Sequence, residues 1–532
     1  MDLQVEPLRI EPVRVEPLGV EPLRLDGSSI SLRTLLQIGT GAAAPVITAA
    51  AREQLVTSRR VLEDNLKSGS KVYGCNTGVG AMKDTIWIAE ALDEFSLDLA
   101  QAHHFGVGPR LPASVVRAAL AIRINTALTG RVGCSPELID ALLILLNADY
   151  IPVVQSMGSI GCGDIGLMGQ IAGGLTGAGA ALHHGREMPM REALAACGLE
   201  GLRMKPRDTL ASLSLNAIGY ASAAFAIHSA GGVIRRLLAT GLCAAGALGA
   251  SRNPWLAASV IAIPEHAETG VWLIEASKSW PWTNATHVQD PLSLRMMPQI
   301  FGSALETLCA AAKKLTRATH FADDNPVTIG DEVLTSGGSL PIDVTLALQT
   351  AQIALAHVAR NVFNRCALLV NGGRGGLPIN LVPAGSIATG LGPTLKLAGD
   401  LFTRVLSMSS AISPQALVVA NGIEDEAAFL PLIVERFSVQ VEALGRLAAL
   451  EALLGAEALD IKAETAMGPA GLVYAAARKH AQFRAKGRTI SESLGRIESE
   501  LYSAQFTRQL IRTFPMAERD DLLALDVAAP RD

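Results

Sequence analysis

Long stretches with helical hydrophobic spacing dominate this chain, whereas strand-like runs are few and short. Asp343 opens an apolar-periodic stretch that reaches about Asn364, and residues 424–460 and 490–513 have the same spacing. Apolar residues that recur every three or four positions fall on one face of a helix. Strand-like runs are confined to short segments such as 71–73 and 186–190. The pattern predicts an all-α protein, with a long antiparallel helix bundle and a smaller mixed N-terminal lobe.

The chain divides into four expected segments. Residues 1–27 carry VEPLR-like repeats, and a proline at every fifth position forbids a regular helix, so an extended or disordered tail is expected. Residues 28–200 are expected to form the N-terminal lobe, residues 201–515 the helical bundle and residues 516–532 a second tail. Within the lobe, Ser135-Pro136-Glu137 predicts the start of a helix, because serine caps the helix and proline suits its first position. Residues 366–395 are rich in glycine and proline and are expected to form a loop.

Composition narrows the class of protein. The chain has 532 residues, 49% of them hydrophobic, which is enough for a large core. A net charge of −5 argues against a nucleic-acid partner, and no uninterrupted apolar run is long enough to suggest a membrane span. The seven cysteines are scattered without CxxC spacing. Together with the absence of a signal-peptide pattern, this favours a reduced, cytoplasmic location.

Common catalytic motifs are absent from the sequence. There is no GxxxxGK[ST] phosphate loop, and Gly177-Ala178-Gly179 lacks the third glycine of a dinucleotide site. The pairs His103-His104 and His183-His184 are poor chelates, because neighbouring side chains point in different directions, so no metal is expected. GxSxG and HExxH are also missing. Nucleotide, zinc and serine-hydrolase chemistry therefore have no support.

Residues 158–164, Gly-Ser-Ile-Gly-Cys-Gly-Asp, are the most unusual segment. Two glycines flank Cys162, and glycine lets a backbone bend tightly because it has no Cβ. The cysteine sulfur is a β-substituent that can leave. Such a segment can cyclise on itself and generate an electrophile.

Two further loops carry candidate functional groups. Tyr73 lies in the loop Tyr-Gly-Cys-Asn-Thr-Gly-Val-Gly and can act as a general base if its phenol is acidified; a buried turn tyrosine has the same signature. Arg295 follows Gln289-Asp290-Pro291-Leu292-Ser293-Leu294, and its fork suits a carboxylate, although a structural ion pair explains it equally well.

Taken together, these segments resemble the histidine/phenylalanine ammonia-lyases. YGCNTGVG is similar to the family's YGxNTGFG, GSIGCGD to GSVGASGD, VQDPLSLRMMPQIFG to VQDxYSxRCxPQVxG, Leu213–Asn216 to its Leu/Asn segment, and Asp323-Asp324-Asn325-Pro326 to TDNP. The matches keep the family's order across about residues 28–515. The resemblance implies an all-α fold, a homotetramer with sites shared between subunits, and the self-made cofactor 4-methylideneimidazol-5-one (MIO).

The resemblance also implies roles for individual residues. Gly161, Cys162 and Gly163 would form MIO autocatalytically, and Tyr73 would take the β-proton of the substrate. Arg295 would hold the substrate carboxylate, while Asn216 and Gln289 would line the site. His103 stands where histidine-specific members carry their Ser-His and would meet an imidazole side chain; a solvent-facing helix histidine is the alternative.

Several positions depart from the family pattern. GSIGCGD is one residue shorter than GSVGASGD, Leu292 replaces an active-site tyrosine, and Asn421–Asp425 lacks the glutamine of the NQE element. The favoured interpretation is an ammonia-lyase that acts on an aromatic or imidazole-bearing amino acid, with a histidine-like substrate preferred. A 2,3-aminomutase of the same family and a non-catalytic relative without MIO are the alternatives.

Overall fold

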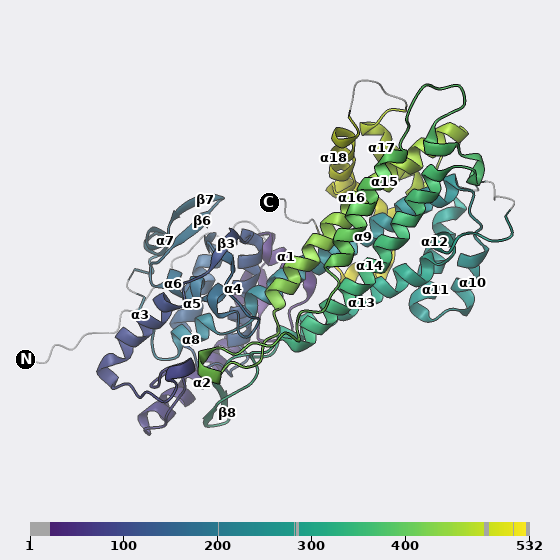
Figure 1. The fold of residues 1–532 in the computed structure, drawn as a ribbon. Coiled ribbons are helices and arrows are strands. Elements are labelled where there is room, and N and C mark those ends of the chain that lie inside the picture. Colours follow the sequence, from purple (N-terminus) through teal and green to yellow (C-terminus); the bar gives the residue numbers. More distant parts are fainter. Residues whose placement is uncertain are drawn as a thin grey trace, which may run out of the picture.

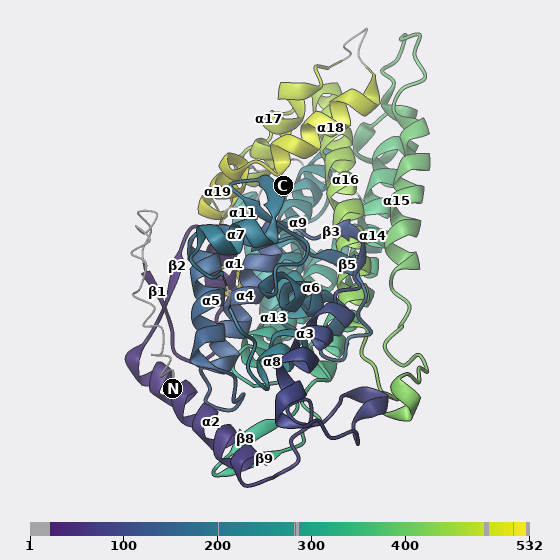
Figure 2. The same ribbon diagram turned by 90° about the vertical axis from the view of Figure 1, so that its left-hand side faces the viewer.

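The computed structural model describes residues 22–200, 202–280, 282, 287–483, 489–513 and 515–527. A lobe built from the N-terminal part of the chain adjoins one end of a long helix bundle, which gives an elongated molecule (Figure 1). In the second view, α17 and α18 lie at one end and β8, β9 and α2 lie at the other (Figure 2). The predicted helical bundle with a smaller mixed lobe is confirmed.

The N-terminal lobe combines helices with small sheets. Its helices are α1 (Leu32–Gly39), α2 (Ala49–Lys67), α3 (Leu92–Ala102), α4 (Ala113–Ala127), α5 (Pro136–Asn147), α6 (Ile165–Leu175), α7 (Met190–Ala196) and α8 (Asp208–Leu213), with the 3₁₀ turns η1 (Gly80–Met82) and η2 (Ala89–Ala91). Its strands are β1 (Pro22–Leu25), β2 (Ala44–Ile47), β3 (Val107–Arg110), β4 (Tyr150–Pro152), β5 (Gln155–Met157), β6 (Ala180–His183) and β7 (Arg186–Pro189). Strands β1 and β2 are parallel, β3 pairs antiparallel with β5, and β4, β6 and β7 form an antiparallel sheet. Helix α4 is buried on nearly every side and forms the centre of the lobe.

The bundle is built around the long helices α9, α13, α14 and α16. Its helices are α9 (Ala217–Ala247), α10 (Asn253–Ile261), α11 (Pro264–Lys278), α12 (Leu292–Arg295), α13 (Met297–Ala318), α14 (Ile342–Asn371), α15 (Leu395–Ser407), α16 (Leu430–Lys462), α17 (Gly468–His480), α18 (Ile490–Leu501), α19 (Ala504–Thr513) and α20 (Ala517–Leu522). The hairpin β8 (Val327–Ile329) and β9 (Glu332–Leu334) and the turns η3 (Arg374–Gly376), η4 (Ile379–Leu381), η5 (Gly392–Thr394) and η6 (Ala420–Gly422) complete it.

Long-range packing and one buried ion pair join the bundle helices. Helices α9 and α16 pack along each other, and α14 packs against both α13 and α16. Between them, Arg365 and Glu451 form a fully buried ion pair at 2.5 Å, and Thr240 donates a hydrogen bond to the same carboxylate. Each of these two charges therefore has a partner; burying either charge alone would be very costly in free energy.

Some predicted boundaries are confirmed and others are wrong. Ser135 caps α5, because its side chain accepts a hydrogen bond from Leu138 N. Helix α16 begins at Leu430, so residues 424–429 are loop rather than helix. The predicted helix 490–513 is two helices, because Ser503 caps the start of α19 through Phe506 N. Residues 186–189 form β7, whereas residues 71–73 form no strand and a turn begins at Tyr73.

The chain ends also differ from expectation. Regular structure is already present before the expected start at Ser28, because β1 contains Pro22–Leu25, pairs with β2 and buries Leu25. Residues 1–21, which hold most of the VEPLR-like repeats, lie outside the described residues. The expected C-terminal tail contains α20, followed by the buried Leu523 and Leu525. In the glycine-rich segment 366–395, residues 366–371 still belong to α14, and the loop begins at Gly372.

Two helical segments reach the length and apolar content of a membrane span. These are Asp208–Ala247 and Ile342–Asn371, and 83% and 61% of their most apolar windows are buried inside the protein. Helices of a large protein core have the same composition.

Candidate active site

The Gly-Cys-Gly segment forms a tight loop between β5 and α6. Gly161, Gly163 and Asp164 all have positive φ angles, of 70°, 75° and 45°. The Ser159 hydroxyl accepts a hydrogen bond from Gly161 N at 2.9 Å and donates one to Asp164 Oδ1 at 2.9 Å. The loop is thus folded back on itself, as a cyclising segment requires.

Only glycine fits at position 161. A Cβ there would lie 2.4 Å from the backbone nitrogen of Phe429 and 2.5 Å from that of Leu430. Phe429 N also donates a hydrogen bond to Ile160 O at 2.8 Å, which fixes the loop against the start of α16. An alanine at this position would therefore collide with the start of α16.

Cys162 is half-buried and faces a loop of the bundle. Its Sγ lies 3.7 Å from the Ser339 hydroxyl oxygen. Burial raises the pKa of the Cys162 thiol, and the negative charges of Glu424, Asp164 and Asp323 add to that effect. The thiol is therefore protonated at neutral pH.

Gly163 donates its amide hydrogen to two oxygens. The acceptors are Asn216 Oδ1 at 2.9 Å and the backbone carbonyl of Ser339 at 3.0 Å. Asn216 is fully buried at the start of α9, and its own amide nitrogen donates to Asp323 Oδ2 at 2.7 Å and to Ser339 O at 2.8 Å. The structure thus brings the predicted Asn216 to the predicted trio.

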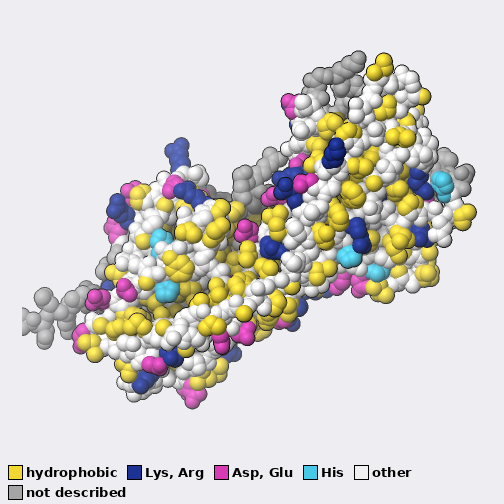
Figure 3. Space-filling model, viewed as in Figure 1, with side chains coloured by type: hydrophobic (Ala, Val, Ile, Leu, Met, Phe, Trp, Pro, Cys, Tyr) yellow, Lys and Arg dark blue, Asp and Glu magenta, His cyan; other side chains and the backbone are white. Residues whose placement is uncertain are grey.

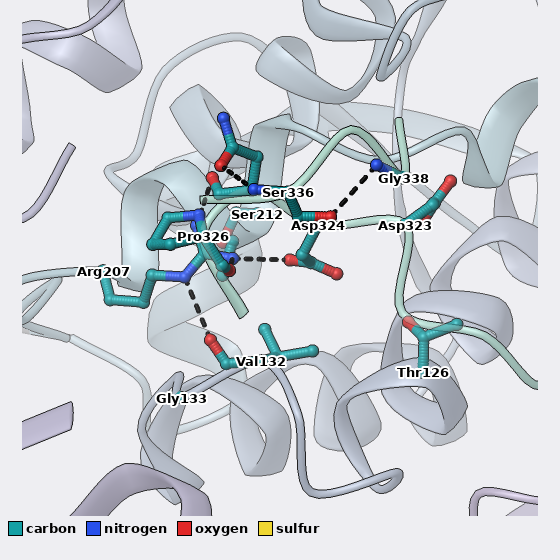
Figure 4. A network of polar contacts seen from close by, with 12 residues as sticks. Thr126, Val132, Gly133, Arg207, Ser212, Asp323, Asp324, Pro326, Ser336 and Gly338 are labelled. Carbon is teal, nitrogen blue, oxygen red and sulfur yellow. Dashed lines mark hydrogen bonds and ion pairs between the residues drawn. The ribbon is translucent and has the colours of Figure 1, made fainter. Parts of the chain in front are cut away.

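Polar contacts beneath the loop hold Asp324, the neighbour of Asp323. The guanidinium of Arg123 lies 3.0 Å from the Asp324 carboxylate, and that of Arg207 lies 2.8 Å from it. Figure 4 shows Arg207 pointing at Asp324, while Asp323 projects away on the other side. Two buried cations and one buried carboxylate thus fix this segment under the site.

Tyr73 lies in the same region, with its hydroxyl accepting a hydrogen bond from Gly80 N at 2.9 Å. Burial raises the pKa of Tyr73, and the charges of Glu424 and Cys162 raise it further. A tyrosine that acts as a base was expected to have a lowered pKa. The phenol of Tyr73 is not acidified within a single chain. Tyr73 packs on a small apolar cluster that includes Ala172 of α6 and Leu213 of α8, the helices next to the Cys162 loop and Asn216.

His103 and Glu424 complete the group. His103 follows the last turn of α3, and its Nδ1 lies 2.8 Å from Leu99 O, which leaves Nε2 available. Burial raises the pKa of Glu424, and the proximity of His103 partly counteracts this. His103 lies against Gly169 of α6, the helix that follows the Cys162 loop. Glu424 had no predicted role; the only sequence signal for it is its place in the NQE-like element.

Gln289 and Arg295 lie elsewhere in the chain. The Arg295 guanidinium donates to the side-chain oxygen of Gln289, next to the exposed Leu292. Helix α12, which ends at Arg295, is at the far end of the bundle from α3 and α8 (Figure 1). Within a single chain, these two predicted substrate-binding residues do not reach Cys162. Among the described residues, no group of three His, Cys, Asp or Glu side chains is arranged to hold a metal ion.

Known proteins resemble this chain over most of its length. The family model described as aromatic amino acid lyase matches residues 30–484. A histidine ammonia-lyase from Anaeromyxobacter sp. (strain K) is 30% identical over 88% of this chain and 95% of its own length. Two solved structures share the fold. Ergothionase from Treponema denticola has a TM-score of 0.87 at 24% identity, covering 90% of this chain and 98% of its own. Histidine ammonia-lyase from Trypanosoma cruzi has a TM-score of 0.84 at 21% identity, covering 96% and 99%.

Proposed function

Because this chain belongs to the aromatic amino acid lyase family, we propose that it eliminates ammonia from an α-amino acid with an aromatic or imidazole side chain. The product is the corresponding α,β-unsaturated acid, and a histidine-like substrate is favoured. The observation that carries the proposal is the bent Gly161-Cys162-Gly163 loop, which is held against Asn216 by the Gly163 amide.

The residues of the loop fit the MIO group. Gly161 provides a carbonyl, Cys162 a β-substituent that can leave, and Gly163 a nitrogen whose N–H is polarised by two acceptors. The loop is one residue shorter than in the family pattern, but this trio contains every atom that the ring needs. MIO supplies an electrophilic carbon that captures the substrate, which makes the amine a better leaving group.

The surrounding side chains accept the proton from the substrate and orient the substrate side chain. Tyr73 accepts the β-proton of the substrate at its hydroxyl oxygen when the phenol is ionised. Burial raises the pKa of Tyr73, so its phenolate is a strong base. His103, with Nε2 available, faces the imidazole of a histidine-like substrate.

We place the substrate carboxylate on Arg295 of a neighbouring chain in a homotetramer. The distance between α12 and the cyclising loop within one chain supports this arrangement (Figure 1). Helix α14 exposes Ile342, Leu346 and Ile353, which share one face, and apolar side chains are spread over the bundle surface (Figure 3). If two chains bury this face of α14 against each other, Arg295 of one chain can reach the Cys162 loop of the other. The cytoplasm is the proposed location, because all seven cysteines are free thiols.

Incubation of the purified protein with L-histidine and with L-phenylalanine tests the proposal. Release of ammonia together with the unsaturated acid is the expected result, with histidine as the better substrate. A β-amino acid product would identify an aminomutase, which the names of the curated relatives do not favour. No product from any aromatic amino acid would identify a non-catalytic relative.

A further inference from the structure

Asp323 is a buried carboxylate that the roles above leave unused. Its Oδ2 accepts hydrogen bonds from the backbone nitrogen of Asn216 at 2.9 Å and from Asn216 Nδ2 at 2.7 Å. The adjacent Asp324 is bound by both Arg123 and Arg207, whereas Asp323 points away from Arg207 (Figure 4). The Asp323 carboxylate thus accepts hydrogen bonds from Asn216, whereas the two arginines bind Asp324.

This contact fixes which end of the Asn216 amide faces the loop. Both hydrogens of Nδ2 are used, one by Asp323 and one by the Ser339 carbonyl. The remaining group, Oδ1, then accepts the Gly163 N–H at 2.9 Å. A flipped amide would place Nδ2 against the Gly163 N–H and Oδ1 against the Asp323 carboxylate. Both contacts would be repulsive, so the carboxylate selects one orientation.

We propose that Asp323 is the positioning residue for ring closure, acting on the Gly163 nitrogen through the Asn216 amide. A carboxylate bound to Nδ2 increases the negative charge on Oδ1, which strengthens its hydrogen bond to Gly163 N–H and makes that nitrogen more nucleophilic. This inference rests on the proposed function, because it concerns the same ring.

The ring-closing step balances without any further reactant. The Gly163 nitrogen bonds to the carbonyl carbon of Gly161, and that oxygen leaves as water with the amide hydrogens of Gly163 and Cys162. The Cα hydrogen and the thiol of Cys162 then leave as hydrogen sulfide. Asn216 and Asp323 keep their atoms throughout, so they act by orientation and charge.

The charge state of Asp323 suits this role. Burial and the neighbouring Asp324 raise its pKa to about 6, while hydrogen bonds from Asn216 and the charge of Arg123 oppose the rise. The groups that interact with it electrostatically include Cys162, Asp164, Tyr220, Asp324 and Arg123. At neutral pH Asp323 is therefore mostly ionised.

Intact mass measured at intervals after a pulse of expression tests the inference. In wild-type protein, the loss of water plus hydrogen sulfide should appear early. In Asp323→Asn, which is neutral and nearly isosteric, the same loss should appear about tenfold more slowly, because a charge-assisted hydrogen bond becomes a neutral one. Asp323→Ser, which is also neutral, provides a second variant if the first does not fold.

Asp208→Asn is the matched control. Asp208 is an equally buried carboxylate that accepts hydrogen bonds from Ser135 N at 2.8 Å and Ser135 Oγ at 2.7 Å, away from the loop. With a similar loss of thermal stability, this control should cyclise at the wild-type rate. Equal cyclisation rates in the wild type and both Asp323 variants would overturn this inference and leave the proposed function intact. Cyclisation that is slowed as much in Asp208→Asn as in Asp323→Asn would also overturn it. A wild-type protein that keeps its Cys162 thiol would overturn the proposed function and this inference together.

Discussion

The amide hydrogen of Gly163 points at Asn216 Oδ1, with 2.9 Å between nitrogen and oxygen. This contact joins a loop of the N-terminal lobe to Asn216, the residue that precedes α9, the first long helix of the bundle. It places the nitrogen that must act as nucleophile next to a buried, charge-oriented amide. The chemistry of the site therefore depends on how lobe and bundle meet.

Replacing Gly161 by alanine should disrupt the loop. The added Cβ would lie 2.4 Å from Phe429 N, and the φ angle of 70° is itself unfavourable for alanine. We expect a loss of about 3 kcal/mol in the free energy of unfolding and no cyclised product. Gly69→Ala is the control, because Gly69 has φ 85° but a Cβ there meets no atom within 4 Å. That variant should lose only about 1 kcal/mol; equal losses in denaturant titrations would contradict the steric argument.

Replacing Tyr73 by phenylalanine should abolish turnover and spare the fold. The variant loses one hydrogen bond, from Gly80 N, which is worth about 1 kcal/mol. Loss of the proton acceptor should lower kcat by about 10²- to 10⁴-fold. Steady-state kinetics and circular dichroism check the two halves of this expectation. Turnover at the wild-type level would remove Tyr73 from the role of base.

Two inactive variants should restore activity when they share a tetramer. If Tyr73 and Arg295 of one site come from different chains, co-expression of Tyr73→Phe and Arg295→Ala chains gives some sites with both native residues. Random mixing predicts activity at about a quarter of the sites. Each variant expressed alone is the control and should be inactive. Mixed protein with no activity above those controls would show that the two residues belong to one chain or to no common site.

Stability should depend on pH through Asp164. Burial raises the pKa of this carboxyl to about 7, although hydrogen bonds from Gly219 N and Ser159 oppose the rise. Between about pH 4 and 7 the folded chain then holds a proton that the unfolded chain has lost, so the contribution of this group falls as pH rises. The slope approaches about 1.4 kcal/mol per pH unit within that window.

Asp164→Asn isolates this contribution, because every other group is the same in both proteins. The wild type should lose stability relative to the variant from pH 5 to pH 7.5, and the difference should level off at higher pH. Urea titrations at four or five pH values measure it. Parallel pH profiles for the two proteins would contradict a raised pKa at Asp164.

Local sequence signals predicted much of the fold. The Ser135-Pro136 start of α5 and the periodic stretch of α14 depend on neighbours within a few turns of the same helix, and both were confirmed. The loop before α16 was missed, because apolar residues 427–430 continue the helical pattern although Phe429 has a positive φ of 53°. That conformation is stabilised by the contact of Phe429 N with Ile160, which no local pattern reveals.

The site was predictable where its residues lie in distinctive loops. The sequence marks Tyr73, Cys162 and Asn216. The structure places the Cys162 loop against Asn216, and it packs Tyr73 on α6 and α8 next to them. Asp323 and Ser339 act through contacts that span more than a hundred residues, so their part in the site needed the fold. Gln289 and Arg295 were identified, but their place at the other end of the bundle is a property of the tertiary structure.

Intact mass of the purified wild-type protein tests the central claim most directly. Proteolytic mapping should locate any change in the peptide that contains residues 158–164, and alkylation of the unfolded protein should report the Cys162 thiol. The account predicts a mass lower by one water and one hydrogen sulfide, with Cys162 no longer alkylated. An unmodified mass with an alkylatable Cys162 would contradict it.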